Sequence, residues 1–311
     1  MKNILLLGGN GFIGKNLLNL MDSHDLENNF GIYMTSSTSE SLCMDNLEKY
    51  KIFNFQLSEV DKIKNIISEN KISIILHLVS SLIPSSDKND YEQDLKNVVL
   101  PSLNLFSYAA DNEIKIIFIS SGGTVYKDSN FPHKEDDALE AISYYGKSKI
   151  ILENNLRQLK EEKNLRYLIL RPSNVYGNGW NANSSQGLIP NVINNIINKE
   201  PITIWGNGLI KRDYLFVDDL SNAIVSFLES DDLDGVFNVG SSFIYTVLDV
   251  IKKIEKKLNV PTKKIFYDSR DVDVSCNILD ITKIKEAIDF QPRNLDLGLD
   301  RIIDNINYQN E

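Results

Sequence analysis

The sequence is poor in cysteine, in long apolar runs and in positive charge. Its 311 residues contain two cysteines, Cys43 and Cys276, which lie far apart and match no metal-ligand spacing. We therefore expect reduced thiols in a cytoplasmic protein, and no bound metal. The formal net charge of −10 disfavours nucleic acid or an anionic membrane as a general partner. No segment approaches the roughly 20 apolar residues of a membrane span, and the first apolar run breaks at Gly8, too early for a secretory signal peptide.

The first fourteen residues predict a strand, a tight loop and a helix. After a short apolar run, Gly8, Gly11 and Gly14 stand at three-residue spacing, and apolar residues then recur at helical spacing. Gly8 would let the chain turn sharply, Gly11 would let the backbone approach a pyrophosphate, and Gly14 would let the helix lie close to the sheet. The N–H groups that open the helix, at Phe12 and Ile13, would face the anion. A dinucleotide-binding loop is therefore favoured over a glycine-rich turn without a ligand.

The first half of the chain alternates β-rich apolar runs with longer amphipathic segments. Continuous apolar runs such as residues 114–120 suit strands that are buried on both faces, and the alternation requires right-handed crossovers in a parallel sheet. We predict strands at residues 4–7, 30–34, 52–55, 72–79, 114–120 and 167–171, and helices at residues 12–21, 60–68, 94–110 and 145–162.

The amino-acid composition changes after residue 173. Asn, Gly and Ser become frequent, which indicates a loop region that leaves the sheet. We therefore predict an α/β fold in which residues 1–173 form a Rossmann-type doubly wound parallel sheet, and residues 174–311 form a smaller, mostly helical substrate lobe. Strands near residues 213–217 and 236–239 are expected to return to the sheet. The other elements predicted in this half are a strand at residues 202–205 and helices at residues 188–197, 218–229, 248–258 and 281–288.

A second informative stretch, residues 143–149 with the sequence SYYGKSK, begins a predicted helix. Tyr145 and Lys149 are four residues apart, so both side chains project from one face of that helix. An ammonium group near a phenol favours phenolate and lowers the tyrosine pKa, which makes the tyrosine a competent general acid or base. A motif of this kind standing alone would more often be a surface contact between an aromatic ring and a lysine.

Further segments accompany this pair in a fixed order along the chain. They are the glycine loop, ISSGGTVY at residues 119–126, YGKSK at 145–149, RPSNVYG at 171–177 and RDYLFVDD at 212–219. Together they resemble the extended short-chain dehydrogenase/reductase family, in its nucleotide-sugar epimerase, dehydratase and reductase branch, from Ile4 to about Gly240. The resemblance implies NAD or NADP as cofactor and a nucleotide-diphosphate sugar as substrate. It also implies a homodimer paired through the helices at residues 94–110 and 145–162.

The resemblance assigns roles to single residues on the cofactor side. Tyr145 would be the acid or base for a sugar hydroxyl or ketone, and Lys149 would hold the nicotinamide ribose while tuning Tyr145. Asn97 would brace the cofactor side of the site. Further candidates for cofactor contacts are Leu57, Ser120 and Pro172.

On the substrate side, Arg212 and Arg270 match two arginines that clamp the diphosphate, a role suited to planar bidentate donors. Asn174 matches a residue near the same diphosphate, and Trp205 stands where the family offers an apolar or aromatic wall to the nucleotide base. For each of these residues, the alternative is an ordinary packing or surface role. Further candidates for substrate contacts are Ser121 and Leu188.

The turn before Tyr126 departs from the family pattern at two points. The residue four before Tyr126 is normally Ser or Thr, which hydrogen-bonds to the reacting oxygen, and here it is Gly122. Thr124 and Ser121 are the nearest candidates to replace it, and Thr124 is preferred because it lies two residues along the same turn. The turn also lacks the carboxylate that dehydratases and decarboxylases carry there, which disfavours both activities.

The segment that should choose between NAD and NADP lacks the usual acid. An NAD site carries Asp or Glu at the end of the second strand, whereas here the strand is followed by hydroxyl-bearing residues from Thr35 and Ser36 onward. The choice between NAD and NADP stays open, with a slight preference for a site that accepts NADP. The usual Gly-Asp after the third strand is also absent, so the amide of Gln56 would have to hold the adenine.

Two reactions fit one such site. In a 4-epimerase, Tyr145 would take the proton from the sugar 4-hydroxyl during transient oxidation at C4, and the ketone would then be reduced on its other face. In a reductase, Tyr145 would protonate the ketone of a 4-keto-6-deoxy sugar linked to dTDP, UDP or GDP. We rank a UDP-hexose 4-epimerase first and this reductase second. A nucleotide-sugar dehydratase and a non-catalytic NAD(P) sensor on the same fold follow.

Overall fold

The computed structural model describes residues 2–24, 29–36, 49–129, 131–179, 187–269 and 276–309. Two residues of the sequence-based reading, Cys43 and Arg270, lie outside these ranges. The side chains of Ser36 and Cys276 are likewise not described, so the expectations attached to these four residues stay predictions.

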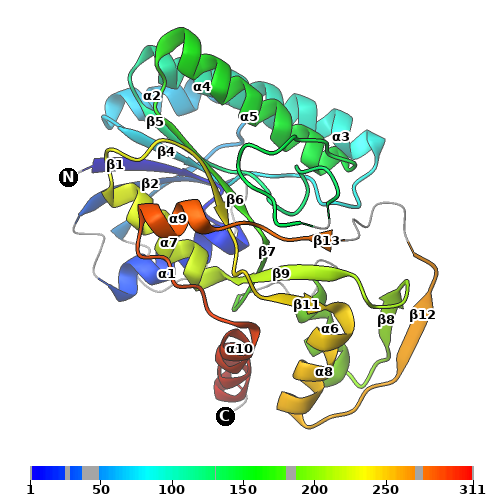
Figure 1. The fold of residues 1–311 in the computed structure, drawn as a ribbon. Helices are drawn as coiled ribbons and strands as arrows, with labels where there is room; N and C mark the ends of the chain where they lie inside the picture. Colours follow the sequence, from blue (N-terminus) through cyan, green and yellow to red (C-terminus); the bar gives the residue numbers. More distant parts are fainter. Residues whose placement is uncertain are drawn as a thin grey trace.

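Seven parallel strands form the main sheet: β1 (Lys2–Leu7), β2 (Phe30–Ser36), β3 (Lys51–Asn54), β4 (Ile74–His77), β5 (Lys115–Ile119), β6 (Tyr167–Pro172) and β10 (Gly235–Val239). Their order is β10-β6-β5-β4-β1-β2-β3 (Figure 1), so the predicted doubly wound parallel sheet is confirmed. The strand order reverses between β1 and β4. In sheets of this kind, ligands bind at the carboxyl ends of the strands beside that point.

Helices cover both faces of the main sheet (Figure 1). One face carries α1 (Phe12–Ser23), α7 (Val217–Glu229) and α9 (Thr282–Ala287), and the other carries α2 (Val60–Glu69), α4 (Leu100–Asp111) and α5 (Tyr144–Lys163). In β1, Ile4 and Leu6 pack with the first set, whereas Leu5 and Leu7 pack with the second. Successive side chains of a strand face opposite sides, so an unbroken apolar run encodes a strand buried on both faces.

The helix expected over residues 94–110 is longer and is interrupted by a π-helical turn. Pro101 lacks the N–H that an α-helix would donate to the carbonyl of Asn97. The N–H of Leu100 bonds instead to the carbonyl of Leu95, five residues earlier, which is the pattern of a π-helix. The segments in chain order are α3 (Lys88–Asp94), the π-helical η3 (Leu95–Val99) and α4.

A second lobe has its own apolar core and two small sheets. Its elements are β7 (Asn174–Tyr176), α6 (Leu188–Ile197), β8 (Ile202–Trp205), β9 (Lys211–Phe216), β11 (Ile244–Thr246), α8 (Val247–Leu258), β12 (Lys264–Tyr267), β13 (Cys276–Asn277) and α10 (Leu295–Gln309). β9 pairs with β7, β11 and β13, so the expectation that residues 213–217 return to the main sheet is wrong. β10 does join that sheet, beside β6, as predicted.

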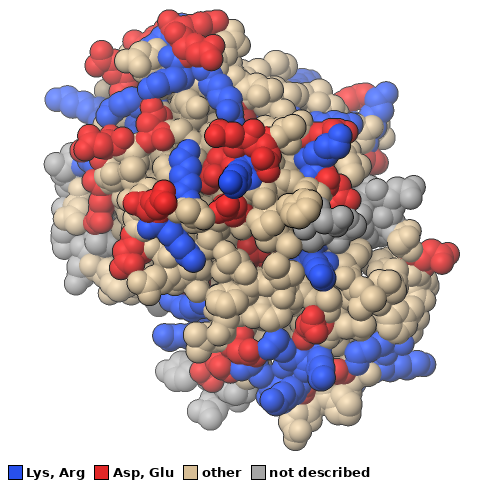
Figure 2. Space-filling model, in the orientation of Figure 1, with Lys and Arg blue, Asp and Glu red and all other residues tan. Residues whose placement is uncertain are grey.

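Acidic and basic side chains are interspersed over much of the surface. Figure 2 shows this mixture, with lysines gathered around α8 in the second lobe. Within the described ranges, none of the helices combines the length and the apolar character that crossing a bilayer demands.

Candidate active site

The glycine loop joins β1 to α1 at the carboxyl edge of the main sheet. Gly8 has a φ of +87°, a left-handed conformation that favours glycine in this tight turn. Gly11 is the N-cap of α1 and donates its N–H to the carbonyl of Gly8 at 3.0 Å. The described first turn of α1 holds no acidic residue, so the positive end of the helix is available to an anion. The loop therefore fits the pyrophosphate of a dinucleotide.

The third glycine makes a different contact from the one expected. A Cβ atom on Gly14 would lie 2.5 Å from the carbonyl oxygen of Gly9 and 2.8 Å from that of Gly8. Gly14 thus lets α1 pack against the glycine loop itself, rather than against the strands. Phe12 and Ile13, the first two residues of α1, carry the backbone N–H groups expected to face the cofactor.

The residues expected around the adenosine follow the ends of β2 and β3. Thr35 is buried, in register between β1 and β3, and β2 ends at Ser36. Gln56 follows β3, and its backbone N–H donates to the carboxylate of Glu59 at 2.9 Å. Leu57 packs against the apolar layer under α2 and α4. These residues share the carboxyl edge of the sheet with the glycine loop, and their contacts with a cofactor stay predictions.

The first turns of α5 carry Tyr145 and Lys149 to the end of β5. The N-cap of this helix is Ser143, whose hydroxyl accepts the N–H of Gly146 at 3.1 Å. The Nζ atom of Lys149 donates to the carbonyl of Ile119, the last residue of β5, at 3.0 Å. The same atom lies 5.6 Å from the ring centroid of Tyr145. The predicted pair is thus assembled at the carboxyl edge of the sheet.

Burial changes the pKa of both members of this pair. It lowers the pKa of Lys149 to about 8, although the carboxylates of Asp94 and Glu153 oppose the change. Burial also raises the pKa of Tyr145, and a hydrogen bond with Ser121 opposes that rise. The pKa of Tyr145 is therefore raised and not lowered as expected, because burial outweighs the effect of Ser121.

The geometry of the turn after β5 explains why residue 122 is a glycine. A Cβ atom on Gly122 would lie 2.6 Å from Leu279 and 2.9 Å from the carbonyl oxygen of Arg171. This position therefore has no room for the Ser or Thr of the family pattern. The hydroxyl of Ser121, one residue earlier, is the neighbouring group that lowers the pKa of Tyr145.

Thr124 lies on the same turn and lines a cavity. Its hydroxyl oxygen is buried and has no hydrogen-bond partner among the described residues. The expectation that Thr124, rather than Ser121, hydrogen-bonds to the reacting oxygen therefore stays a prediction. A buried hydroxyl without a partner carries a cost in free energy, which a hydroxyl group of a substrate would relieve.

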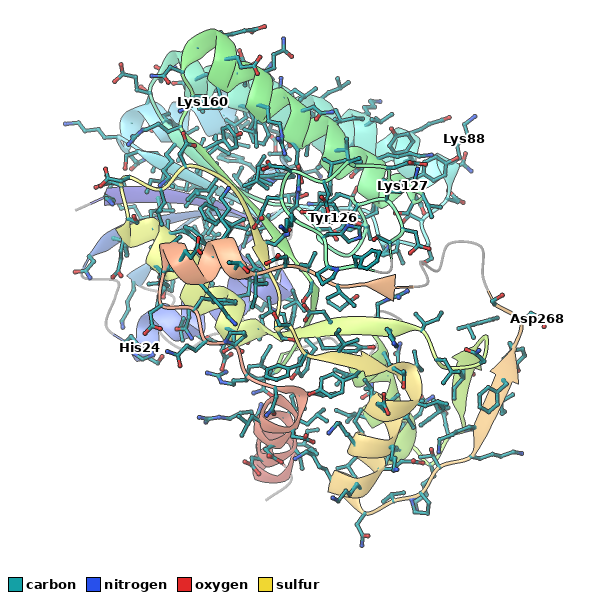
Figure 3. The ribbon with its side chains drawn as sticks, viewed as in Figure 1. His24, Lys88, Tyr126, Lys127, Lys160 and Asp268 are labelled. Carbon is teal, nitrogen blue, oxygen red and sulfur yellow. The ribbon has the colours of Figure 1, made fainter. Side chains whose placement is uncertain are left out.

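A cavity of about 570 Å³ lies between the turn after β5 and the second lobe. Its volume falls within the roughly 300–1,000 Å³ of small-molecule sites. Tyr126, near the centre of the molecule in Figure 3, lines it, and so does Ser143, two residues before Tyr145. The predicted site residues that line the cavity are Thr124, Asn174, Leu188, Trp205 and Arg212.

The substrate candidates in the second lobe lie on its strands. Asn174 on β7 donates its amide to the carbonyl of Asp213 on β9 at 2.9 Å. Arg212 on β9 donates to the carbonyl of the preceding residue at 3.0 Å. Trp205 on β8 is 42% exposed, and its ring centroid lies 5.3 Å from that of Tyr267. Three strands of one lobe thus bring Asn174, Arg212 and Trp205 to one cavity.

Three further residues were predicted to contact the cofactor, and the structure shows their positions and protein partners. Asn97 is exposed on η3. Ser120 is buried, and its hydroxyl donates to the carboxylate of Glu153 at 2.5 Å. Pro172 ends β6, and its carbonyl accepts the N–H of Gly122 at 2.8 Å. The hydroxyl of Ser120 is therefore used inside the protein, and the cofactor contacts of these three residues stay predictions.

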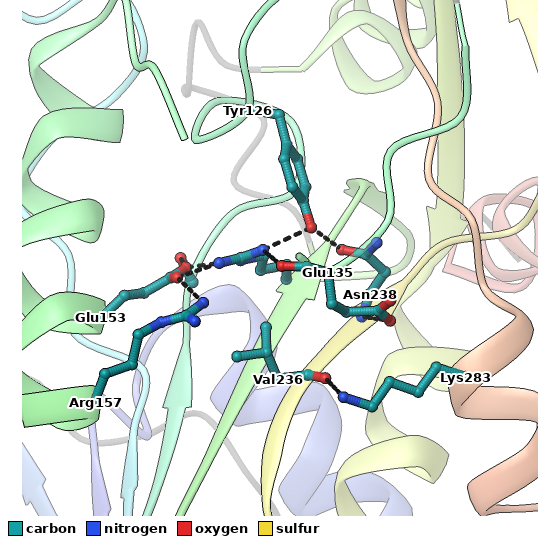
Figure 4. Close-up of polar contacts among 9 residues, drawn as sticks. Tyr126, Glu135, Glu153, Arg157, Val236, Asn238 and Lys283 are labelled. Atoms are coloured by element: carbon teal, nitrogen blue, oxygen red, sulfur yellow. Dashed lines mark hydrogen bonds and ion pairs between the residues drawn. The ribbon is translucent and has the colours of Figure 1, made fainter. Parts of the chain in front are cut away.

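Sequence reasoning missed a buried polar network beside the site (Figure 4). Arg171 and Glu153 have no exposed side-chain area and are joined by hydrogen bonds of 3.0 and 2.5 Å. Arg171 also donates to the hydroxyl of Tyr126 at 2.7 Å, and Tyr126 donates to Asn238 at 2.6 Å. The network links a wall of the cavity to the helix that carries Lys149. Its signal in the sequence was an arginine within the otherwise apolar strand β6.

The fold and the site define a class of protein. A glycine loop opening a doubly wound sheet, a tyrosine and a lysine on one helix, and a cavity at the carboxyl edge are the parts of a nicotinamide-dependent oxidoreductase of the short-chain type. The model of the NAD dependent epimerase/dehydratase family matches residues 4–240, and the chain belongs to this family. It is therefore an enzyme of a family that uses a nicotinamide dinucleotide.

Relatives of known name match almost the whole chain. A dTDP-4-dehydro-6-deoxyglucose reductase from Escherichia coli is 35% identical over 308 residues, which cover 97% of this chain and 97% of the relative. A putative UDP-glucose 4-epimerase from Methanocaldococcus jannaschii is 26% identical and covers 96% and 97%. The crystal structure of a UDP-glucose 4-epimerase from Thermotoga maritima with UDP-glucose has a TM-score of 0.90 at 27% identity, covering 99% of this chain and 100% of that one.

Proposed function

We propose that the enzyme oxidises or reduces C4 of the sugar in a nucleotide-diphosphate sugar. The observation that carries this proposal is the pairing of Tyr145 with Lys149 at the end of β5, beside a cavity that Thr124 lines. When bound, the nicotinamide dinucleotide supplies the hydride chemistry. The chain itself supplies position and the transfer of a proton.

Tyr145 is the proposed acid or base at the sugar O4 atom. Because burial raises its pKa, the phenol is protonated at neutral pH, which suits donation to an oxygen that gains negative charge. Ser121 lowers the pKa of the same phenol and would bond to it during the transfer. Lys149, held at the end of β5, is the proposed partner of the nicotinamide ribose.

Of the two reactions, we propose first the reduction of a 4-keto-6-deoxy nucleotide sugar. The reductase relative is 35% identical over almost the full length, against 26% for the putative epimerase. The protonated state of Tyr145 supports the same direction, because a reductase needs an acid at O4. A UDP-hexose 4-epimerase is the second candidate, supported by the TM-score of 0.90 with the epimerase of Thermotoga maritima.

Substrate contacts follow from the cavity and from the family pattern. We propose that Arg212 and Arg270 clamp the diphosphate and that Asn174 lies near it. Trp205, partly exposed beside Tyr267, would meet the nucleotide base together with Leu188. Thr124, with its buried hydroxyl, would bond to a hydroxyl group of the sugar.

The cofactor site is proposed to accept NADP as well as NAD. β2 ends at Thr35 and Ser36, where a strict NAD site carries an acid that would repel a 2′-phosphate. Gln56, with an exposed side chain after β3, would contact the adenine. Cofactor released from the purified protein, identified by mass spectrometry, tests this assignment.

We also propose that the enzyme is a cytoplasmic homodimer. Leu100 on α4 is 61% exposed, and α4 packs beside α5 at the surface of the main sheet. Burial of such an apolar residue between two copies would remove it from water. Sedimentation at micromolar concentration should give the mass of a dimer, and Leu100→Glu should shift it to that of a monomer.

Parallel assays with the two kinds of substrate distinguish the reductase from the epimerase. Purified enzyme is given dTDP-4-keto-6-deoxyglucose with stoichiometric NADPH or NADH, and in parallel UDP-glucose or UDP-galactose with only catalytic cofactor. We expect cofactor consumption in the first reaction. Interconversion of the two UDP-hexoses without net cofactor consumption would establish the epimerase instead, and inactivity with every nucleotide sugar would reject the class of reaction.

A further inference from the structure

Asp94 is a buried carboxylate next to the proposed catalytic pair. It ends α3, just before the π-helical turn, and is 2% exposed. Its two carboxylate oxygens accept hydrogen bonds from the hydroxyl of Ser81 at 2.5 Å and from that of Ser148 at 2.6 Å. Ser81 follows β4, and Ser148 lies on α5, directly before Lys149. One side chain thus joins three segments that meet at the active site.

The partners of Asp94 differ from those of Glu153, the other buried carboxylate nearby. Glu153 forms an ion pair with Arg171 at 2.5 Å and lies 3.8 Å from Arg157. Within the described part of the chain, the hydrogen-bond partners of Asp94 are the two neutral hydroxyls. Lys149 is the buried cation that both carboxylates act on, and Glu153 is already balanced by arginine. Asp94, bonded to Ser148 directly before Lys149, is therefore the carboxylate near Lys149 that no arginine pairs with in the described part of the chain.

We propose that Asp94 is a positioning residue of this active site, which holds the first turns of α5 through Ser148 and provides the counter-charge of Lys149. The role deepens the proposed function, because it acts on the pair that would manage the proton at C4. A buried lysine without a counter-charge is readily neutralised, since a low dielectric disfavours an isolated ion. A carboxylate without a cation is disfavoured for the same reason, so each group supports the charge of the other.

Other ionisable groups lie near Asp94 and Lys149, and their charges matter for the titration of Lys149. Burial lowers the pKa of His77, on β4, to about 3, so this histidine stays neutral in the range where Lys149 titrates. Burial and the charge of Asp94 raise the pKa of Tyr91, whose ring stacks on that of Tyr144 at 4.9 Å. Asp94 also contributes to the raised pKa of Tyr145. Removal of its charge should therefore lower the pKa of Lys149 and of Tyr145 together.

The test compares unfolding by urea between pH 7 and pH 10 for four variants of the full-length protein. Asp94→Asn removes the charge but keeps an oxygen and nearly the same size. Ser148→Ala removes one hydrogen bond and keeps the charge. Asp94→Glu keeps the charge on a longer side chain, and Glu92→Gln is the matched control, because it removes one exposed carboxylate from the same helix.

The native state binds fewer protons than the unfolded state once Lys149 loses its proton, so stability should rise with pH from about pH 8 onward. In Asp94→Asn, the onset of this rise should move down by about 0.5–1 pH unit. Asp94→Glu, Ser148→Ala and Glu92→Gln should keep the wild-type onset. An unchanged onset in Asp94→Asn, or an equal shift in Ser148→Ala, would overturn the role of the charge.

Activity gives a second and separate measurement. In the reductive direction, kcat/KM should fall above the pKa values of the pair, and this falling limb should move to lower pH in Asp94→Asn but not in Glu92→Gln. If no nucleotide sugar is turned over, the proposed function fails while the unfolding experiment still reports on Asp94. If turnover is present but neither the onset nor the limb moves, the proposal for Asp94 fails alone.

Discussion

Arg171 on β6 and Glu153 on α5 place opposite charges against each other with no exposed side-chain area on either. Two hydrogen bonds, of 3.0 and 2.5 Å, join the guanidinium to the carboxylate. Each ion is therefore desolvated and depends on the other for compensation. The pair is also continuous with Ser120 and Tyr126, which flank the turn beside Tyr145.

Arg171→Met should destabilise the protein strongly, because it leaves Glu153 buried and without its main partner. Loss of one member of a buried pair costs about 3–5 kcal/mol. Urea unfolding at pH 7 measures the effect. The control is Lys163→Met, which breaks an exposed pair with Asp111 and should cost less than about 1 kcal/mol. Equal costs for the two variants would show that burial does not determine the strength of the Arg171 pair.

Tyr145→Phe should lower kcat by roughly 10²–10⁴-fold, because the variant has no hydroxyl to transfer the proton at C4. The fluorescence of bound NADH or NADPH should be unchanged, since the ring is retained. Tyr144→Phe is the control, because Tyr144 precedes Tyr145 on α5 and stacks on Tyr91 instead. Turnover at the wild-type rate in Tyr145→Phe would remove this tyrosine from the mechanism.

Ser121→Ala and Thr124→Val should have different effects although the two residues share a turn. The hydrogen bond with Ser121 lowers the pKa of Tyr145, so its loss should move the kinetic pKa of that tyrosine upward and reduce kcat. Thr124→Val should raise KM for the sugar by about 5-fold, as expected for one lost hydrogen bond of about 1 kcal/mol. The reverse pattern would make Thr124 the group that acts on Tyr145.

Stability should rise between pH 8 and pH 10 because of Lys149. Its pKa in the folded state is lowered to about 8, so the folded state releases this proton at lower pH than the unfolded state does. The unfolded state then binds more protons, and the free energy of unfolding increases with pH, by roughly 1–2 kcal/mol. Lys149→Met should abolish this increase, which urea titrations at several pH values would detect. A parallel increase in wild type and variant would assign the effect to other groups.

The sequence was most informative where a local pattern decides the structure. Residues 188–197 and 202–205 form the predicted helix and strand, since Gly187 and Pro201 mark where these elements begin. The glycine loop was likewise readable because its spacing matches a single strand–turn–helix geometry. These features depend on neighbours along the chain.

Features that depend on distant partners were not readable. The strand pattern at residues 213–217 is genuine, but alternation does not encode whether a strand pairs with β10 or with β7 and β11. The absence of a hydroxyl at Gly122 was visible, but its cause was not, because Leu279 and the carbonyl of Arg171 exclude a side chain there. The sequence also did not predict that the charges of Asp94 and Glu153 act on Lys149, because that effect depends on the fold that brings them together.

The position of Leu279 limits how far the chain could be shortened. It lies beyond the segment that the family model matches, yet it packs under Gly122 in the catalytic turn and is 1% exposed. The neighbouring backbone is tied to His133 by two hydrogen bonds of 2.8 Å. A fragment ending at residue 240 would keep the whole segment that the family model matches and lose Leu279, against which the turn after β5 packs. The functional unit of this enzyme is therefore larger than the unit by which its sequence is recognised.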